Sequence, residues 1–166
     1  NKDVLNGLLQ PKSVAVVGAS ETVGKIGHTV LLNLQKSKYK GGIFPINPKS
    51  DEILGYKCYK NVLDVKEPID AAIITVPAKF VSQLIDDCGK KGIKGLLVIT
   101  SGFSEVGLDD LEKEIVDKAH SYGMRLLGPN IVGVLSNSDD FNGSFAPFLP
   151  FKGSASLVSQ SGALLI

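Results

Sequence analysis

Glycine and lysine gather in the segment Gly18–Gly27 (GASETVGKIG), which follows a short apolar run. Glycines let a backbone approach a ligand closely, and the free N–H groups of a helix that begins after such a loop attract phosphate. The spacing differs from the dinucleotide pattern GxGxxG, because Ser20 takes the place of the second glycine. It also differs from the Walker A loop, because five residues, not four, precede Gly24-Lys25 and Ile26 follows. We predict an anion-binding loop of another kind.

A lysine stands where domains that bind NAD carry an acidic residue. The second predicted strand ends in Ile46-Asn47-Pro48-Lys49, so Lys49 replaces the carboxylate that would accept the ribose hydroxyl. A cation there suits an additional phosphate, as in coenzyme A (CoA) or NADP. Residues 1–60 hold nine lysines against four acidic residues, whereas residues 61–166 hold nine basic against thirteen acidic residues. The distribution favours an anionic ligand near the N-terminal half.

Composition excludes several classes of protein. The chain has 166 residues, is 43% hydrophobic and 21% charged, and carries a net charge of +1, which gives no reason to expect nucleic acid. No apolar run approaches the roughly 18 residues of a membrane span, and residues 1–10 show no signal peptide. Cys58 and Cys88 fit no metal-binding spacing. We interpret them as reduced thiols of a cytoplasmic protein.

Turn residues divide the chain into alternating apolar runs and amphipathic segments. Strands are predicted at 13–17, 43–46, 71–76, 96–99 and 125–127, and helices over 26–34, 81–88 and 108–122. Pro45 favours either a position at the edge of the sheet or an early end for the second strand. The alternation predicts a Rossmann-like α/β domain, a parallel sheet flanked by helices. Ligands bind at the carboxyl ends of such strands; the loops expected there are 18–27, 47–49, 76–78 and 100–104.

The remaining segments are less regular. Residues 47–70 are predicted to hold one short strand near Lys57–Tyr59, and Asn137–Gly153 to form a loop with exposed phenylalanines. Ala155–Val158 predicts a new strand, and the segment from Ser159 to Ala163 the beginning of a helix. We therefore divide the chain into a Rossmann-like domain (1–150) and the truncated beginning of a second domain (151–166). We expect the natural protein to continue.

Six segments, in this order, resemble the CoA-binding domain of ADP-forming acyl-CoA synthetases, relatives of the succinyl-CoA synthetase α subunit. They are SVAVVGAS (13–20) with GKIG (24–27), FPINPK (44–49), ITVPA (74–78), VITSGFSEVG (98–107), GPNIVGV (128–134) and VSQSGAL (158–164). The resemblance covers nearly the whole chain. It implies that residues 151–166 open a flavodoxin-like ligase domain.

The resemblance also implies roles for individual residues. CoA would be bound on its phosphate side by Gly18, Ser20, Gly24, Lys25, Ile26 and Lys49, and on its adenosine side by Val76, Pro77, Ile99, Thr100 and Ser101. The acyl-transfer centre would lie near Gly128, Pro129 and Asn130, and the phosphate of a phosphohistidine near Ser161 and Gly162.

The family reaction converts acyl-CoA, ADP and phosphate into the acid, CoA and ATP through an acyl phosphate and a phosphohistidine. His28 and His120 do not match the family's histidine motif, and we interpret both as structural. We therefore expect the chain alone to be inactive, with no catalytic residue and no metal site. ADP or ATP with Mg²⁺, the remaining ligase domains and an ATP-grasp domain or subunit would complete the enzyme, without nucleic acid or membrane as partners.

Two alternatives stay open. An NADP-binding oxidoreductase domain would require a Tyr-x-x-x-Lys pair on a helix, and Tyr56 and Lys60 have that spacing in an irregular stretch. The second alternative is a CoA-binding regulatory domain that is fused to a protein acetyltransferase.

Overall fold

The computed structural model describes residues 2–164, and a five-stranded parallel sheet forms its centre. The strands β1 (Ser13–Val17), β2 (Gly42–Ile46), β5 (Ala71–Ile74), β6 (Gly95–Val98) and β7 (Arg125–Leu127) lie in the order β2-β1-β5-β6-β7. The strands β1, β5 and β6 are apolar on both faces because helices cover both faces of the sheet. The predicted α/β class and its five strands are confirmed.

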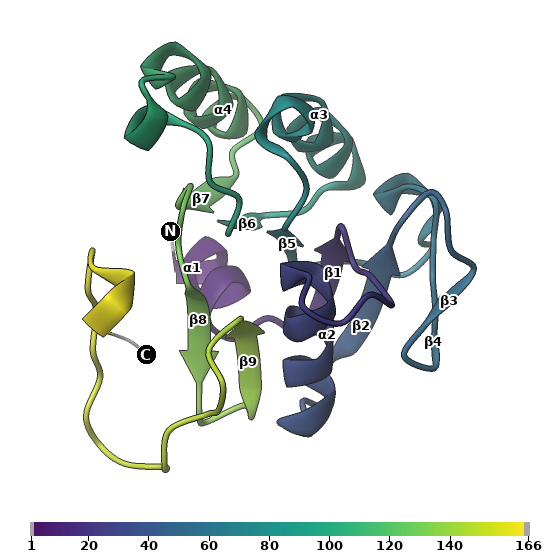
Figure 1. Cartoon of the computed structure of the whole chain (residues 1–166), viewed down its shortest axis with the longest axis vertical. Helices are drawn as coiled ribbons and strands as arrows, with labels where there is room; N and C mark the ends of the chain where they lie inside the picture. Colours follow the sequence, from purple (N-terminus) through teal and green to yellow (C-terminus); the bar gives the residue numbers. More distant parts are fainter. Residues whose placement is uncertain (1, 165–166) are drawn as a thin grey trace.

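Four helices flank the sheet (Figure 1). α3 (Val81–Lys91) and α4 (Asp109–Ser121) lie side by side on one face, whereas α1 (Lys2–Leu9) and α2 (Ile26–Lys36) cover the other. The predictions for α2, α3 and α4 are confirmed. Sequence analysis missed α1, which Leu8 anchors in the core beneath the sheet.

The strand order places the carboxyl ends of all five strands at one edge of the sheet. β1 pairs in parallel with β2 on one side and with β5 on the other. The chain therefore runs outward to β2, returns past β1 to β5, and continues through β6 to β7. This reversal between β1 and β5 is the position at which sheets of this type bind ligands.

The segment after β2 covers one edge of the sheet. Pro45 lies in the edge strand as predicted, and its carbonyl accepts a hydrogen bond from the N–H of Tyr59 (2.9 Å). In place of the single strand expected near Lys57–Tyr59, the chain forms the antiparallel pair β3 (Glu52–Ile53) and β4 (Tyr56–Lys57). Its two-residue turn has positive φ at both Leu54 and Gly55 (50° and 80°), which suits a tight hairpin.

The loop predicted for Asn137–Gly153 is wrong in its first part. β8 (Gly133–Ser136) and β9 (Phe141–Ser144) form an antiparallel hairpin that packs on α2. Phe141 was expected to be exposed but is fully buried, with its ring centroid 5.2 Å from that of Tyr39. Phe148 and Phe151 are exposed, as predicted.

A buried amide fastens this hairpin to α2. Asn33 Nδ2 donates hydrogen bonds to the carbonyl oxygens of Ser144 (3.0 Å) and Ala146 (2.7 Å). Asn33 is only 7% exposed, so the amide and both carbonyls would be unsatisfied if the hairpin moved away. The tertiary contact, more than local propensity, therefore holds β9 in place.

The strand predicted at Ala155–Val158 does not form. These residues have no regular structure, and the side chain of Val158 is 98% exposed. A strand needs a neighbour for its backbone hydrogen bonds, and residues 155–158 pair with no strand in the described chain. The predicted helix beginning is present only as the 3₁₀ turn η4 (Gly162–Leu164). The domain boundary at residue 150 stays a prediction.

Two further expectations concern the thiols and the membrane. Cys58 and Cys88 are unpaired and buried, and burial raises the pKa of the Cys88 thiol to about 12. None of the helices within residues 2–164 has the length and apolar character needed to cross a membrane.

Candidate functional site

The loop between β1 and α2 is shaped by two glycines in contact. Gly18 has φ +91°, a backbone conformation that other residues rarely adopt. A Cβ atom added to Gly27, in the first turn of α2, would lie 2.0 Å from the carbonyl oxygen of Gly18. The absence of a side chain therefore lets the N-terminus of α2 lie directly against the end of β1.

The backbone N–H groups of this loop fall into two sets. Some donate within the protein, as Gly18 does to Ile46 O (3.0 Å) and Lys25 to Thr22 O (3.2 Å). Others have no acceptor among the described residues: Ser20, Glu21, Val23, Gly24, Ile26 and Gly27. Free N–H groups at the N-terminus of an 11-residue helix form an arrangement that binds anions.

Two exposed lysines lie on the neighbouring loops. Lys25 is the N-cap residue of α2, and Lys49 follows β2. Neither ammonium group forms an ion pair with a described carboxylate. A single side chain links the two loops: Asn47 Nδ2 donates to Ala19 O (2.8 Å), and Asn47 Oδ1 accepts from the N–H of Lys49 (2.8 Å). The structure therefore brings these loops together, as the sequence predicts.

The loops after β5 and β6 are joined by Thr100. Its hydroxyl donates to the carbonyl oxygens of Val76 (2.7 Å) and Ile74 (3.2 Å). The side chain of Ile99 is buried in the core, so only its backbone could contact a ligand. Among the residues predicted on the adenosine side, Pro77 and Ser101 are exposed.

The Gly128–Asn130 segment after β7 lies against the same edge. The N–H of Asn130 donates to Thr100 O (2.9 Å), and a Cβ on Gly128 would lie 2.4 Å from Val98 O. Gly162 lies beside Val132, since a Cβ there would be 2.7 Å from Val132 Cγ2. Ser161 immediately precedes η4, so the helix N-terminus expected at Ser161-Gly162 is a three-residue turn here.

Sequence analysis missed several residues that shape the site. His28, interpreted as structural, is buried beneath the first loop with Nδ1 3.0 Å from Ser20 O. In the sequence, Asn47 stands before Pro48 and indicates only a turn. Glu21 Oε1 accepts a hydrogen bond from the N–H of Leu54 (2.7 Å) and so connects the loop to the β3–β4 hairpin.

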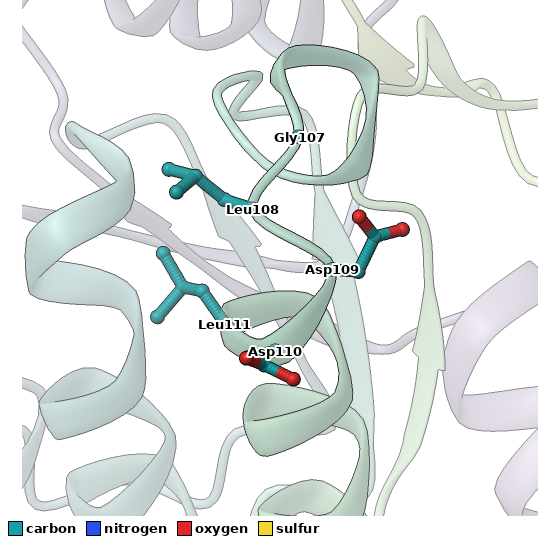
Figure 2. Close-up of a pocket in the computed structure, with 5 residues that line it drawn as sticks. All are labelled: Gly107, Leu108, Asp109, Asp110 and Leu111. Carbon is teal, nitrogen blue, oxygen red and sulfur yellow. The ribbon is translucent and has the colours of Figure 1, made fainter.

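A shallow hollow of about 460 Å³ lies at the beginning of α4, beyond β6, lined by residues 107–111 (Figure 2). Leu108 and Leu111 point to one side of it and Asp109 to the other (Figure 2). The carboxylates of Asp109 and Asp110 would repel a phosphate group. The hollow is therefore unsuited to the anion that the β1–α2 loop can hold.

The residue pair required by the oxidoreductase alternative is not arranged for that chemistry. Tyr56 lies in β4, and Lys60 follows it in an irregular segment rather than on a helix. Lys60 Nζ instead forms an ion pair with Asp51 (2.7 Å) and donates to Ser50 O (3.0 Å).

Comparison with known protein families matches residues 12–137 to the CoA binding domain. The chain is 50% identical over 155 residues to the ADP-forming acetate–CoA ligase of Methanocaldococcus jannaschii, covering 93% of this chain and 22% of that protein. It is 46% identical over 166 residues to the α subunit of ADP-forming acetate–CoA ligase I of Pyrococcus furiosus, covering 96% of this chain and 36% of that subunit.

A solved structure gives the same result. The dinucleotide forming acetyl-coenzyme A synthetase 1 of Candidatus Korarchaeum cryptofilum, in complex with phosphate and ADP, superposes with a TM-score of 0.94 at 50% identity. The match covers 98% of this chain and 35% of that one, so the chain spans about a third or less of the length of these relatives. The matched residues include the β1–α2 loop, Lys49 and the Gly128–Asn130 segment. The chain belongs to the CoA binding domain family and is homologous to one region of ADP-forming acid–CoA ligases.

Proposed function

We propose that this chain binds CoA at the carboxyl edge of its parallel sheet, with the diphosphate on the Gly18–Gly27 loop. The observation that carries the proposal is the set of N–H groups between Ser20 and Gly27, at the N-terminus of α2, that have no acceptor within residues 2–164. Lys25 and Lys49, whose ammonium groups form no ion pair within the same residues, add positive charge on two adjoining loops. Membership of the CoA binding domain family supports CoA as the anion.

The neighbouring loops would hold the rest of the molecule. The adenosine would lie along the loops after β5 and β6, against Val76, Pro77, Thr100, Ser101 and the backbone of Ile99. The thiol arm would extend toward Gly128, Pro129 and Asn130, which a hydrogen bond to Thr100 joins to the same edge. Ser161 and Gly162 would contact a phosphate group beyond them, since Gly162 lies beside Val132.

The complete protein would be an ADP-forming acid–CoA ligase, as its relatives are named. Its reaction would convert acyl-CoA, ADP and phosphate into acid, CoA and ATP through a phosphohistidine outside residues 1–166. The other ligase domains and an ATP-grasp domain or subunit would supply that histidine and the site for ADP, ATP and Mg²⁺. Cys58 and Cys88, which are buried and form no disulfide with each other, fit the cytoplasmic location that we propose.

Calorimetric titration of the chain with CoA, NAD and NADP tests ligand identity. CoA should bind most tightly. Lys25→Ala and Lys49→Ala should each weaken CoA binding by about ten- to a hundredfold, because a charge-assisted hydrogen bond contributes roughly 1.5–3 kcal/mol. The effect should shrink at high salt, which screens exposed charges.

Lys113→Ala is the matched control, since Lys113 is an exposed lysine on α4 outside the loops described above. It should bind CoA as the parent does. Binding of NADP without binding of CoA would contradict the proposal. Parent-like affinity in both loop variants would place the phosphates elsewhere.

A further inference from the structure

Two carbonyl groups of the β1–α2 loop are held by side chains that lie outside residues 18–25. Asn47 Nδ2 donates to Ala19 O at 2.8 Å, from the loop after β2. His28 Nδ1 lies 3.0 Å from Ser20 O, from the first turn of α2. A carbonyl oxygen only accepts, so Nδ1 must carry the proton in this bond. The contact between His28 and Ser20 is buried, since His28 is 7% exposed, and the bond from Asn47 to the buried Ala19 is partly buried.

The direction of a carbonyl fixes that of the N–H that follows it. In a trans peptide the C=O and the next N–H lie in one plane and point in opposite directions. With Ala19 C=O turned toward Asn47, the N–H of Ser20 points away from Asn47. With Ser20 C=O turned toward His28, the N–H of Glu21 points away from His28. Neither N–H has an acceptor in the part of the chain that the structure describes.

We propose that Asn47 and His28 are positioning residues, which aim the N–H groups of Ser20 and Glu21 at the diphosphate of CoA. This inference rests on the proposed function. It adds a physical reason for the geometry of the Gly18–Gly27 loop. A ligand is bound more tightly when its partners need no reordering. The two side chains supply that order through four atoms: Asn47 Nδ2, His28 Nδ1 and the two carbonyl oxygens.

Asn47 has a second effect through the other end of its amide. Its Oδ1 accepts the N–H of Lys49, so one side chain sets the position of the Lys49 backbone relative to Ala19. Loss of Asn47 therefore disturbs both the N–H groups of the first loop and the cation of the second. Loss of the His28 imidazole disturbs the first loop alone.

The test compares CoA affinity by calorimetry in Asn47→Ala, His28→Leu and His28→Asn. Asn47→Ala and His28→Leu should each lower affinity roughly tenfold, which corresponds to about 1.4 kcal/mol. His28→Asn keeps an N–H donor near the position of Nδ1 and should recover most of the loss. Asn47 lies on a surface loop, so its variant gives the answer even if His28→Leu folds poorly.

Asn33→Ala is the matched control. Like Asn47, Asn33 donates from its side-chain amide to the backbone, but Asn33 is buried and its two carbonyl acceptors belong to Ser144 and Ala146. Its loss should lower the melting temperature and leave CoA affinity unchanged. In ¹H–¹⁵N spectra of the parent, addition of CoA should shift the amide signals of Ser20 and Glu21. In His28→Leu the same addition should shift them less. A purely structural role for His28 would not produce this difference.

Three results are decisive. The inference is supported if CoA affinity falls about tenfold in Asn47→Ala and in His28→Leu. In that case His28→Asn should regain most of the affinity, and Asn33→Ala should bind CoA as the parent does. If Asn47→Ala and His28→Leu both bind CoA as tightly as the parent, the inference is overturned and the proposed function stays intact. Absence of CoA binding by the parent chain overturns the proposed function and the inference with it.

Discussion

Replacement of Gly27 by alanine tests whether the contact between α2 and β1 is as close as the structure shows. The added Cβ would lie 2.0 Å from Gly18 O, 2.8 Å from Gly18 C and 2.9 Å from Thr75 Oγ1. Two of these atoms belong to the backbone of the β1–α2 loop, so no side-chain rotation relieves the overlap. The N-terminus of α2 must move away from the end of β1.

The expected cost follows from this overlap. Overpacking a close contact destabilises a fold by about 1–3 kcal/mol, and we expect about 2 kcal/mol here because the obstruction is mostly backbone. In a domain of this size each kcal/mol lowers the melting temperature by about 2–4 °C, so the loss should be about 4–8 °C. CoA affinity should fall as well, since the displaced helix carries the free N–H groups of Ile26 and Gly27.

Calorimetric melting and CoA titration measure the two effects, with Gly7→Ala as the control. Gly7 is also helical, but its added Cβ would lie 3.7 Å from Asp70 O, an ordinary contact. Alanine there should raise stability by about 0.5–1 kcal/mol, because glycine loses more conformational entropy in a helix. A Gly27→Ala variant that melts and binds CoA as the parent does would refute the close approach.

Two further changes test the packing. Phe141→Ala should lower the free energy of unfolding by about 3–5 kcal/mol in urea denaturation, since it empties a fully buried site beside Tyr39; a change under about 1 kcal/mol would contradict the packing of the hairpin on α2. The hydrogen bond from Lys118 holds the pKa of Asp86 below its usual value. The stability from this pair is therefore present above the unfolded pKa, about 3.9, and lost as pH falls through the lower folded pKa. Melting temperatures measured from neutral pH downward should show Lys118→Met destabilised at neutral pH and converging on the parent in acid, whereas a constant difference would contradict the pairing.

The strands of the central sheet could be predicted because they are buried on both faces. Ser13–Val17 and Ala71–Ile74 are short apolar runs of the kind found in strands of a parallel sheet covered on both faces, and turn residues bound each of them. Lys25 and Lys49 could be placed on adjoining loops because each lies in the segment that follows one of two parallel strands, and the carboxyl ends of parallel strands share one edge of the sheet.

The elements that sequence analysis missed owe their structure to distant contacts. The strand Phe141–Ser144 includes Asn142, Gly143 and Ser144, which have little strand propensity of their own, and Asn33 holds its end in place. Ala155–Val158 shows the opposite case, an apolar run that has no partner strand within residues 2–164. The sequence shows His28 as a structural residue and Asn47 as a turn residue, but not the bond that each makes to a loop carbonyl, because side-chain patterns carry no information on the direction of a carbonyl group.

The packing of the β8–β9 hairpin on α2 decides where this domain can be cut for recombinant production. The family match ends at residue 137, between the two strands. A chain shortened there would keep β8 without its partner and remove Phe141 from the apolar cluster that contains Leu31 and Leu34. It would also leave the buried amide of Asn33 without both of its acceptors. An expression boundary placed after Ala146 keeps the hairpin, whereas one drawn at residue 137 removes part of the packing that supports α2.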